Sequence, residues 1–82
     1  MTINLLFFGA CREAATGQSE TALELASPVD VRTVWQSLVE QHPGLGRFET
    51  SILFAINEEY ARPAELLADG DTLAIFPPVS GG

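Results

Sequence analysis

One amphipathic pattern of apolar residues constrains the fold of this chain more than any other sequence feature. Its apolar residues recur at the spacing of one face of an α-helix, namely Val31, Val34, Trp35, Leu38 and Val39. Asp30 is expected to cap this helix, because its carboxylate can accept hydrogen bonds from the unpaired first-turn amides. Pro43-Gly44 is expected to end it. This is the one long helix that the pattern predicts, so it must cover a sheet by itself.

Elsewhere the apolar residues alternate every second position, which predicts β-strands. Strands are expected over Thr2–Phe8, Ser19–Leu25, Ile52–Asn57, Tyr60–Ala61 and Thr72–Phe76. A loop is expected over Gly9–Gly17 and a tight turn at Glu58-Glu59. The order of these elements predicts an α+β domain over residues 1–76, with a mixed sheet of four to five strands and the helix packed on one face. Residues 77–82 are expected to form a flexible tail.

The alternation also predicts which side chains remain uncovered. One set of strand residues should face the helix: Ile3, Leu5, Phe7, Leu73 and Ile75. Leu6, Phe8, Ala74 and Phe76 then lie on the other face, where no second helix is available. Exposed aromatic residues often mark an interface, so Phe8, Phe76 and the nearby Tyr60 are predicted to contact a partner. The alternative is that loops pack over this face.

Charge narrows the choice of partners. The 82 residues carry 11 acidic and four basic side chains, a formal net charge of -7. Such a chain is not expected to bind nucleic acid or anionic membranes, and a basic partner surface is favoured. Cys11 is the only cysteine, which is typical of a reducing cytoplasm. Neither a signal peptide nor a membrane-spanning run is recognisable, so the predicted location is cytoplasmic.

Side chains offer little catalytic chemistry. Cys11 and His42 are the only thiol and imidazole, and they are expected on separate elements. The carboxylates are scattered and there are too few Cys and His residues for a metal site, so no metal and no cofactor bound by this chain are predicted. Arg12 and Glu13 are expected to hold the loop after the first strand. Any active site is therefore expected to be supplied by a partner.

The tail is the remaining candidate. Pro77-Pro78 forms a stiff spacer that would project Gly81-Gly82 away from the sheet. Glycines have no Cβ atom, so such a tail can enter a narrow channel and leaves its terminal carboxylate unhindered. A carboxylate is a poor electrophile and would need activation by a partner that uses ATP. Capture of sulfide by the activated carboxylate would then give a terminal thiocarboxylate, which is a sulfur nucleophile.

These residues carry a resemblance to a known family. The segments concerned are Leu6-Phe7-Phe8, Arg12-Glu13, Ala55-Ile56-Asn57, Leu67-Ala68-Asp69-Gly70-Asp71 and Phe76-Pro77-Pro78-Val79-Ser80-Gly81-Gly82. Together they resemble the sulfur carrier subunits of molybdopterin synthase, in the ubiquitin-like β-grasp superfamily. Ser80 stands where many relatives have threonine.

The resemblance implies a cycle and three partners. An activating enzyme would use ATP to convert Gly82 into a glycyl adenylate, and a sulfur donor enzyme would convert the adenylate into a thiocarboxylate. Residues Pro77, Pro78, Val79, Ser80 and Gly81 would thread the tail into the active site of the large, catalytic subunit. Sulfur would pass there to cyclic pyranopterin monophosphate during molybdenum cofactor biosynthesis. The implied assembly is a heterotetramer in which this chain is a non-catalytic carrier.

Three alternatives remain open on the sequence. A sulfur carrier for the thiamine thiazole ring would also end in two glycines, although Phe76-Pro77-Pro78-Val79 fits the molybdopterin branch better. A ubiquitin-like modifier would join Gly82 to lysines of other proteins. A simple interaction module would function without its tail.

Overall fold

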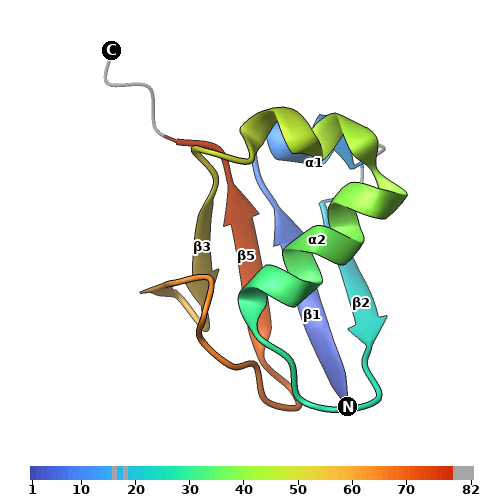
Figure 1. Cartoon of the computed structure of the whole chain (residues 1–82), viewed down its shortest axis with the longest axis vertical. Helices are drawn as coiled ribbons and strands as arrows, with labels where there is room; N and C mark the ends of the chain where they lie inside the picture. The colour runs from blue at the N-terminus through green and yellow to red at the C-terminus, as the bar shows by residue number, and fades with distance from the viewer. Residues whose placement is uncertain (16, 18, 79–82) are drawn as a thin grey trace.

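Five strands form one mixed sheet in the computed structural model, which describes residues 1–15, 17 and 19–78 (Figure 1). The elements in chain order are β1 (Thr2–Phe7), α1 (Ala10–Ala14), β2 (Glu20–Glu24), α2 (Val31–Gln41), the 3₁₀-helix η1 (Pro43–Phe48), β3 (Leu53–Ile56), β4 (Glu59–Ala61) and β5 (Thr72–Phe76). The order across the sheet is β2-β1-β5-β3-β4. The predicted α+β class is confirmed.

The centre of the sheet is a parallel pair made from the two ends of the described chain. Strand β1 pairs with β5 in a register that places Asn4 beside Thr72 and Phe7 beside Ile75. Strand β2 returns antiparallel to β1, and β3 is antiparallel to both β5 and β4. Parallel neighbours need a long crossover between them, and here most of the chain forms that crossover.

The core lies between the sheet and α2. Ile3, Leu5, Phe7, Leu73 and Ile75 are all at most 3% exposed, which confirms the predicted helix-facing set. Each such side chain contributes about 1.5–3 kcal/mol through burial of apolar surface. From α2 the core receives Val31, Val34, Trp35 and Leu38. Figure 1 shows α2 lying across one face of the sheet, and the described residues place no helix on the opposite face.

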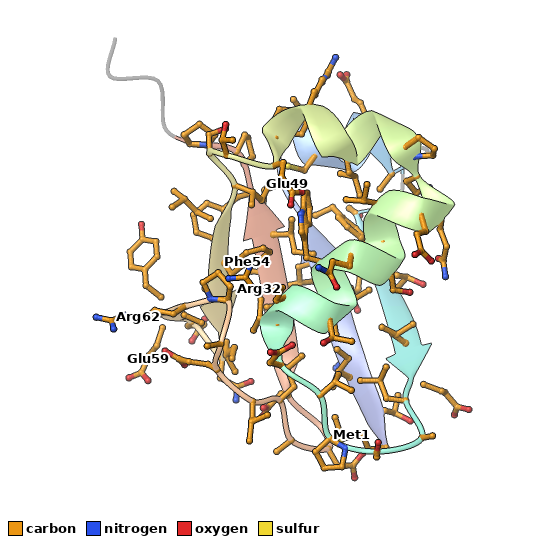
Figure 2. The ribbon with its side chains drawn as sticks, in the orientation of Figure 1. Met1, Arg32, Glu49, Phe54, Glu59 and Arg62 are labelled. Carbon is orange, nitrogen blue, oxygen red and sulfur yellow. The ribbon has the colours of Figure 1, made fainter. Side chains whose placement is uncertain are left out.

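Trp35 connects α2 to β3, the strand next to one edge of the sheet. Its ring packs edge-on against Phe54 of β3, with centroids 5.8 Å apart and planes at 71°. Figure 2 shows Phe54 on the side of the sheet that faces α2, with Glu49 above it. The indole N–H donates a hydrogen bond to the carboxylate of Glu49, which follows η1. A buried indole N–H needs such a partner, so this contact also fixes the end of η1.

Two short helices correct the sequence-based prediction. Residues 10–14 form α1 where a loop was expected, and this helix buries Cys11. A single helical turn is too short to show an apolar period, so the pattern could not reveal it. Pro43-Gly44 was expected only to end α2, but Pro43 also begins η1, whose Leu45 is fully buried. Proline suits the first helical position because the amide it lacks would have no partner there.

The turn between β3 and β4 lies one residue earlier than the sequence predicted. The turn residues are Asn57 and Glu58, both with positive φ, rather than Glu58-Glu59. Glu59 already pairs with Ile56 as the first residue of β4. The short strand itself was predicted correctly at Tyr60–Ala61.

The cap of α2 gives a prediction about pH. The Asp30 carboxylate accepts from the hydroxyl and the backbone N–H of Thr33, at 2.6 and 2.8 Å. Both hydrogen bonds lower the pKa of Asp30 below its usual 3.8, and the bond from the Thr33 hydroxyl has the larger effect. The stabilisation is therefore present above pH 3.8 and is lost as pH falls through the pKa of the folded state. Asp30→Asn should keep the cap, because Asn caps helices as well as Asp, but cannot titrate.

Urea unfolding over a pH series tests this. Near neutral pH the two proteins should have similar midpoints, and below pH 3.8 the wild type should lose stability relative to Asp30→Asn. A constant difference at every pH would show that the charge of Asp30 does not contribute.

Candidate functional site

The helix-free face of the sheet carries the residues predicted to remain uncovered. Leu6 of β1 lies beside Ala74 of β5, and both are half-buried, as is Phe76. Phe8 follows β1 and is 49% exposed. The predicted division of β1 and β5 into two faces is therefore confirmed.

Three aromatic rings on this face form what we call the ring patch, Phe8, Tyr60 and Phe76. Phe76 is central, with its centroid 6.4 Å from Phe8 at 84° and 5.9 Å from Tyr60 at 50°. Tyr60 is 76% exposed. These rings come from three segments, and the sheet register brings together all three residues predicted to contact a partner. Their role in binding stays a prediction.

The ring patch lies where the tail begins. Strand β5 ends at Phe76, because Pro77 has no N–H to continue the ladder. Pro77 is half-buried beside Gly9, where an added Cβ would lie 3.3 Å from the proline Cγ. Gly9 also has a φ of 56°, so the close approach and the backbone both favour glycine. Pro78 is exposed.

The remaining tail residues predicted to carry the chemistry fall outside the described part of the chain. They are Val79, Ser80, Gly81 and Gly82. Strand β5 ends at Phe76, and the predicted division into a domain over residues 1–76 and a tail over residues 77–82 stays a prediction.

A groove of about 530 Å³ adjoins the ring patch. Its lining comes from β1, β5 and the β3–β4 turn, and consists of Leu6, Phe8, Asn57, Glu58, Thr72 and Ala74. Sequence patterning missed Asn57 and Glu58 as lining residues, because their placement depends on the backbone of the turn. Their polar character in a turn between two strands was the only available signal.

Cys11 and His42 lie on separate elements, as expected. Cys11 is fully buried in α1, whereas His42 is the half-buried residue that ends α2. Burial raises the pKa of the Cys11 thiol to about 11, against a smaller opposite effect of Arg47. A thiol with that pKa is almost entirely protonated near neutral pH and is a weak nucleophile. Arg12 and Glu13 are exposed on α1, rather than in the predicted loop.

Residues 1–15, 17 and 19–78 contain neither a metal-binding cluster nor a membrane-spanning helix. No group of three or more His, Cys, Asp or Glu side chains there is arranged to hold a metal ion. None of the helices in those residues has the length and apolar character needed to cross a membrane.

The topology defines the class of protein. A sheet of order β2-β1-β5-β3-β4 around a parallel central pair, covered by one main helix, is the ubiquitin-like β-grasp fold. SAMP1 from Haloferax volcanii shares it with a TM-score of 0.84 and 31% identity over 100% of both chains. A chain from the complex of subunits 1 and 2 of the molybdopterin-converting factor from Helicobacter pylori has the same fold, with a TM-score of 0.70 and 22% identity over 100% of both chains. At that identity the likeness concerns the fold alone.

The chain belongs to the ThiS family, whose model matches residues 5–82. Among curated proteins it is similar to a molybdopterin synthase sulfur carrier subunit of Chlamydomonas reinhardtii, with 39% identity over 84 residues and 100% of both chains covered. The human protein of the same name is 30% identical over 83 residues, covering 98% of this chain and 93% of its own.

The burial of Cys11 predicts slow labelling of its thiol. A pKa of about 11 rather than 9.0 leaves roughly a hundredfold less thiolate at neutral pH, and burial limits access further. Iodoacetamide should therefore modify the folded protein at least about a hundred times more slowly than the urea-unfolded protein. Mass spectrometry measures both rates, and similar rates would show that α1 opens readily.

Proposed function

We propose that this chain is the sulfur carrier subunit of a molybdopterin synthase. The observation that carries the proposal is its likeness to the Chlamydomonas reinhardtii subunit along the whole of both chains. Membership of the ThiS family supports it, since the family match extends through Gly81-Gly82. The ring patch supports it as well, because it presents aromatic side chains suited to docking at the point where β5 ends and the tail begins.

The proposed chemistry takes place on the Gly82 carboxylate. A carboxylate oxygen attacks the α-phosphorus of ATP in an activating enzyme, and pyrophosphate leaves. A sulfur donor then supplies sulfur at the oxidation level of sulfide, which attacks the acyl carbon and displaces AMP. The sulfur of the resulting thiocarboxylate attacks a carbon of cyclic pyranopterin monophosphate and displaces an oxygen substituent, which gives a thioester. Water then cleaves the bond between the acyl carbon and sulfur, so that the sulfur stays on the product and Gly82 regains its carboxylate. Two such transfers are needed for a dithiolene.

In this scheme the folded domain binds the partners, and the tail carries the reactive group. Phe8, Tyr60 and Phe76 dock it on the large subunit, and on the activating enzyme in turn, while Pro77 and Pro78 direct Val79, Ser80, Gly81 and Gly82 into the partner's channel. Large aromatic side chains dominate binding energy at such surfaces because they bury much area at little entropic cost. The active site and ATP belong to the partners, and this chain binds no cofactor itself.

Intact mass spectrometry tests the chemistry. The chain isolated from its own cells should include a form heavier by about 16 Da, because sulfur replaces one oxygen. Fragmentation should confine this gain to the peptide that ends in Gly82. Deletion of Gly82 is the control and should abolish the gain without altering the fold. An unchanged terminus after incubation with ATP, the activating enzyme and a sulfur donor would contradict the proposal.

Substitution of the ring patch tests the docking surface. Phe8→Asp should weaken binding to the large subunit by about 30-fold, or about 2 kcal/mol, because a carboxylate replaces an apolar contact. Phe8 is already 49% exposed, so the domain should stay folded.

Leu66→Asp is the matched control for Phe8→Asp. Leu66 is 71% exposed and lies outside the ring patch, so this variant should bind as the wild type does. Titration calorimetry measures both affinities, and equal affinities for the two variants would contradict docking through the ring patch.

A protein modifier is the second candidate, favoured by the likeness to SAMP1, the small archaeal modifier protein 1. In that case Gly82 would form amide bonds with lysines of other proteins. An immunoblot of a cell lysate separates the two functions. Conjugates larger than the free chain that disappear on deletion of Gly82 would favour the modifier, whereas thiocarboxylate without conjugates would favour the carrier.

A further inference from the structure

The groove beside the ring patch has a charged residue at its edge. Its floor is apolar and comes from Leu6 and Ala74, which lie side by side on the parallel pair. Phe8 belongs to both the groove and the ring patch, so the two surfaces are continuous. Glu58 is the one charged side chain among the described residues that line the groove.

Glu58 occupies a backbone conformation that glutamate rarely adopts. Asn57 has a φ of 50° and Glu58 a φ of 72°. A two-residue hairpin turn with both residues left-handed is usually Asn-Gly, because glycine has no Cβ to crowd the following carbonyl. Asn57 fits that rule and Glu58 breaks it. Residues held in unfavourable backbone conformations often serve binding or catalysis, so the position of Glu58 requires a reason.

Contacts within the fold do not supply that reason. In the described part of the chain, the Glu58 carboxylate forms no hydrogen bond or ion pair. Asn57 instead holds the turn in place. Its backbone N–H donates to the Thr72 carbonyl, its side-chain oxygen accepts from the Thr72 N–H, and its side-chain NH₂ donates to Asp71, all at 2.9 Å. The turn is thereby fixed to the start of β5, with Glu58 at the groove.

The distribution of charge indicates what Glu58 would meet. Three of the four basic side chains, Arg12, Arg32 and Arg47, belong to α1, α2 and η1. The fourth, Arg62, points outward beyond β4 in Figure 2. Glu20 of β2 lies opposite Leu6 in the sheet register, so it adds a second carboxylate near the groove floor. An apolar groove with acidic neighbours is complementary to a basic and apolar segment.

We infer that Glu58 is a docking residue that binds a lysine or arginine side chain of the partner subunit, from a segment whose adjacent apolar side chain fills the groove. This inference rests on the proposed function and names the chemistry of the partner. It also accounts for glutamate at a glycine position, because the charge contributes to binding at the expense of the stability of the turn.

Two variants of Glu58 separate binding from folding. Glu58→Gly removes both the charge and the backbone strain, so its urea midpoint should rise while its affinity for the large subunit falls. Glu58→Lys should weaken binding by about tenfold at low salt, and the loss should shrink as salt screens the repulsion. Glu40→Lys, at an exposed position on α2, carries the same change of charge and should stay within about twofold of the wild type.

Calorimetry with the purified large subunit of molybdopterin synthase from the same organism gives the affinities. Unchanged affinity for both Glu58 variants, equal losses for Glu58→Lys and Glu40→Lys, or a lowered urea midpoint for Glu58→Gly would each overturn the inference. Failure of the wild type to bind the large subunit would instead overturn the proposed function, and the inference with it.

Discussion

The parallel pairing of β1 with β5 is the constraint on which the rest of this structure depends. It joins segments about 70 residues apart, so almost the whole domain lies within the loop that this pairing closes. Closing so long a loop costs chain entropy, which burial of the core must offset. Ile3, Leu5, Leu73 and Ile75, all almost fully buried, provide that offset on the helix-facing side. The same pairing places Phe8 and Phe76 at one end of the sheet, so the ring patch follows from the pairing that closes the fold.

One helix cannot cover two faces of a sheet. One face of this sheet therefore forms the core that stabilises the fold, and the other face is left open for a partner. The face under α2 contains the core, whereas the opposite face exposes Phe8 and Tyr60, two of the three large apolar side chains that the described residues leave well exposed. Arg12, Arg32 and Arg47 belong to the helices and not to the strands that form this second face, and the groove beside the ring patch has an acidic edge at Glu58. A partner of complementary shape and charge can therefore approach without disturbing the core.

Much of the fold could be predicted because its signals are periodic. Strands β1, β2, β3 and β5 and helix α2 each contain enough residues to show a period, whereas the three-residue β4 was recognisable only from the turn before it. The cap at Asp30 was recognisable from one residue. Helices α1 and η1 contain five and six residues, too few for a pattern, so their existence depends on tertiary contacts of Cys11 and Leu45. The ring patch was predictable because strand alternation determines the face of each side chain. The groove was not, because it depends on the left-handed backbone of Asn57 and Glu58, which the sequence does not encode in any period.

The position of Met1 has a practical consequence for handling the protein. The chain enters the sheet at the end where β5 begins, since Gly70 N–H donates to Thr2 O and Asn4 N–H to Asp71 O. In Figures 1 and 2 this end lies opposite the end at which β5 stops. The Met1 nitrogen donates one hydrogen bond to Leu25 O, which a peptide N–H could replace. An affinity tag or a fluorescent protein attached ahead of Met1 is therefore a strand's length away from Phe8, Phe76 and the start of the tail, but it needs a linker that keeps it clear of Glu58, because the Asn57-Glu58 turn is held to the start of β5.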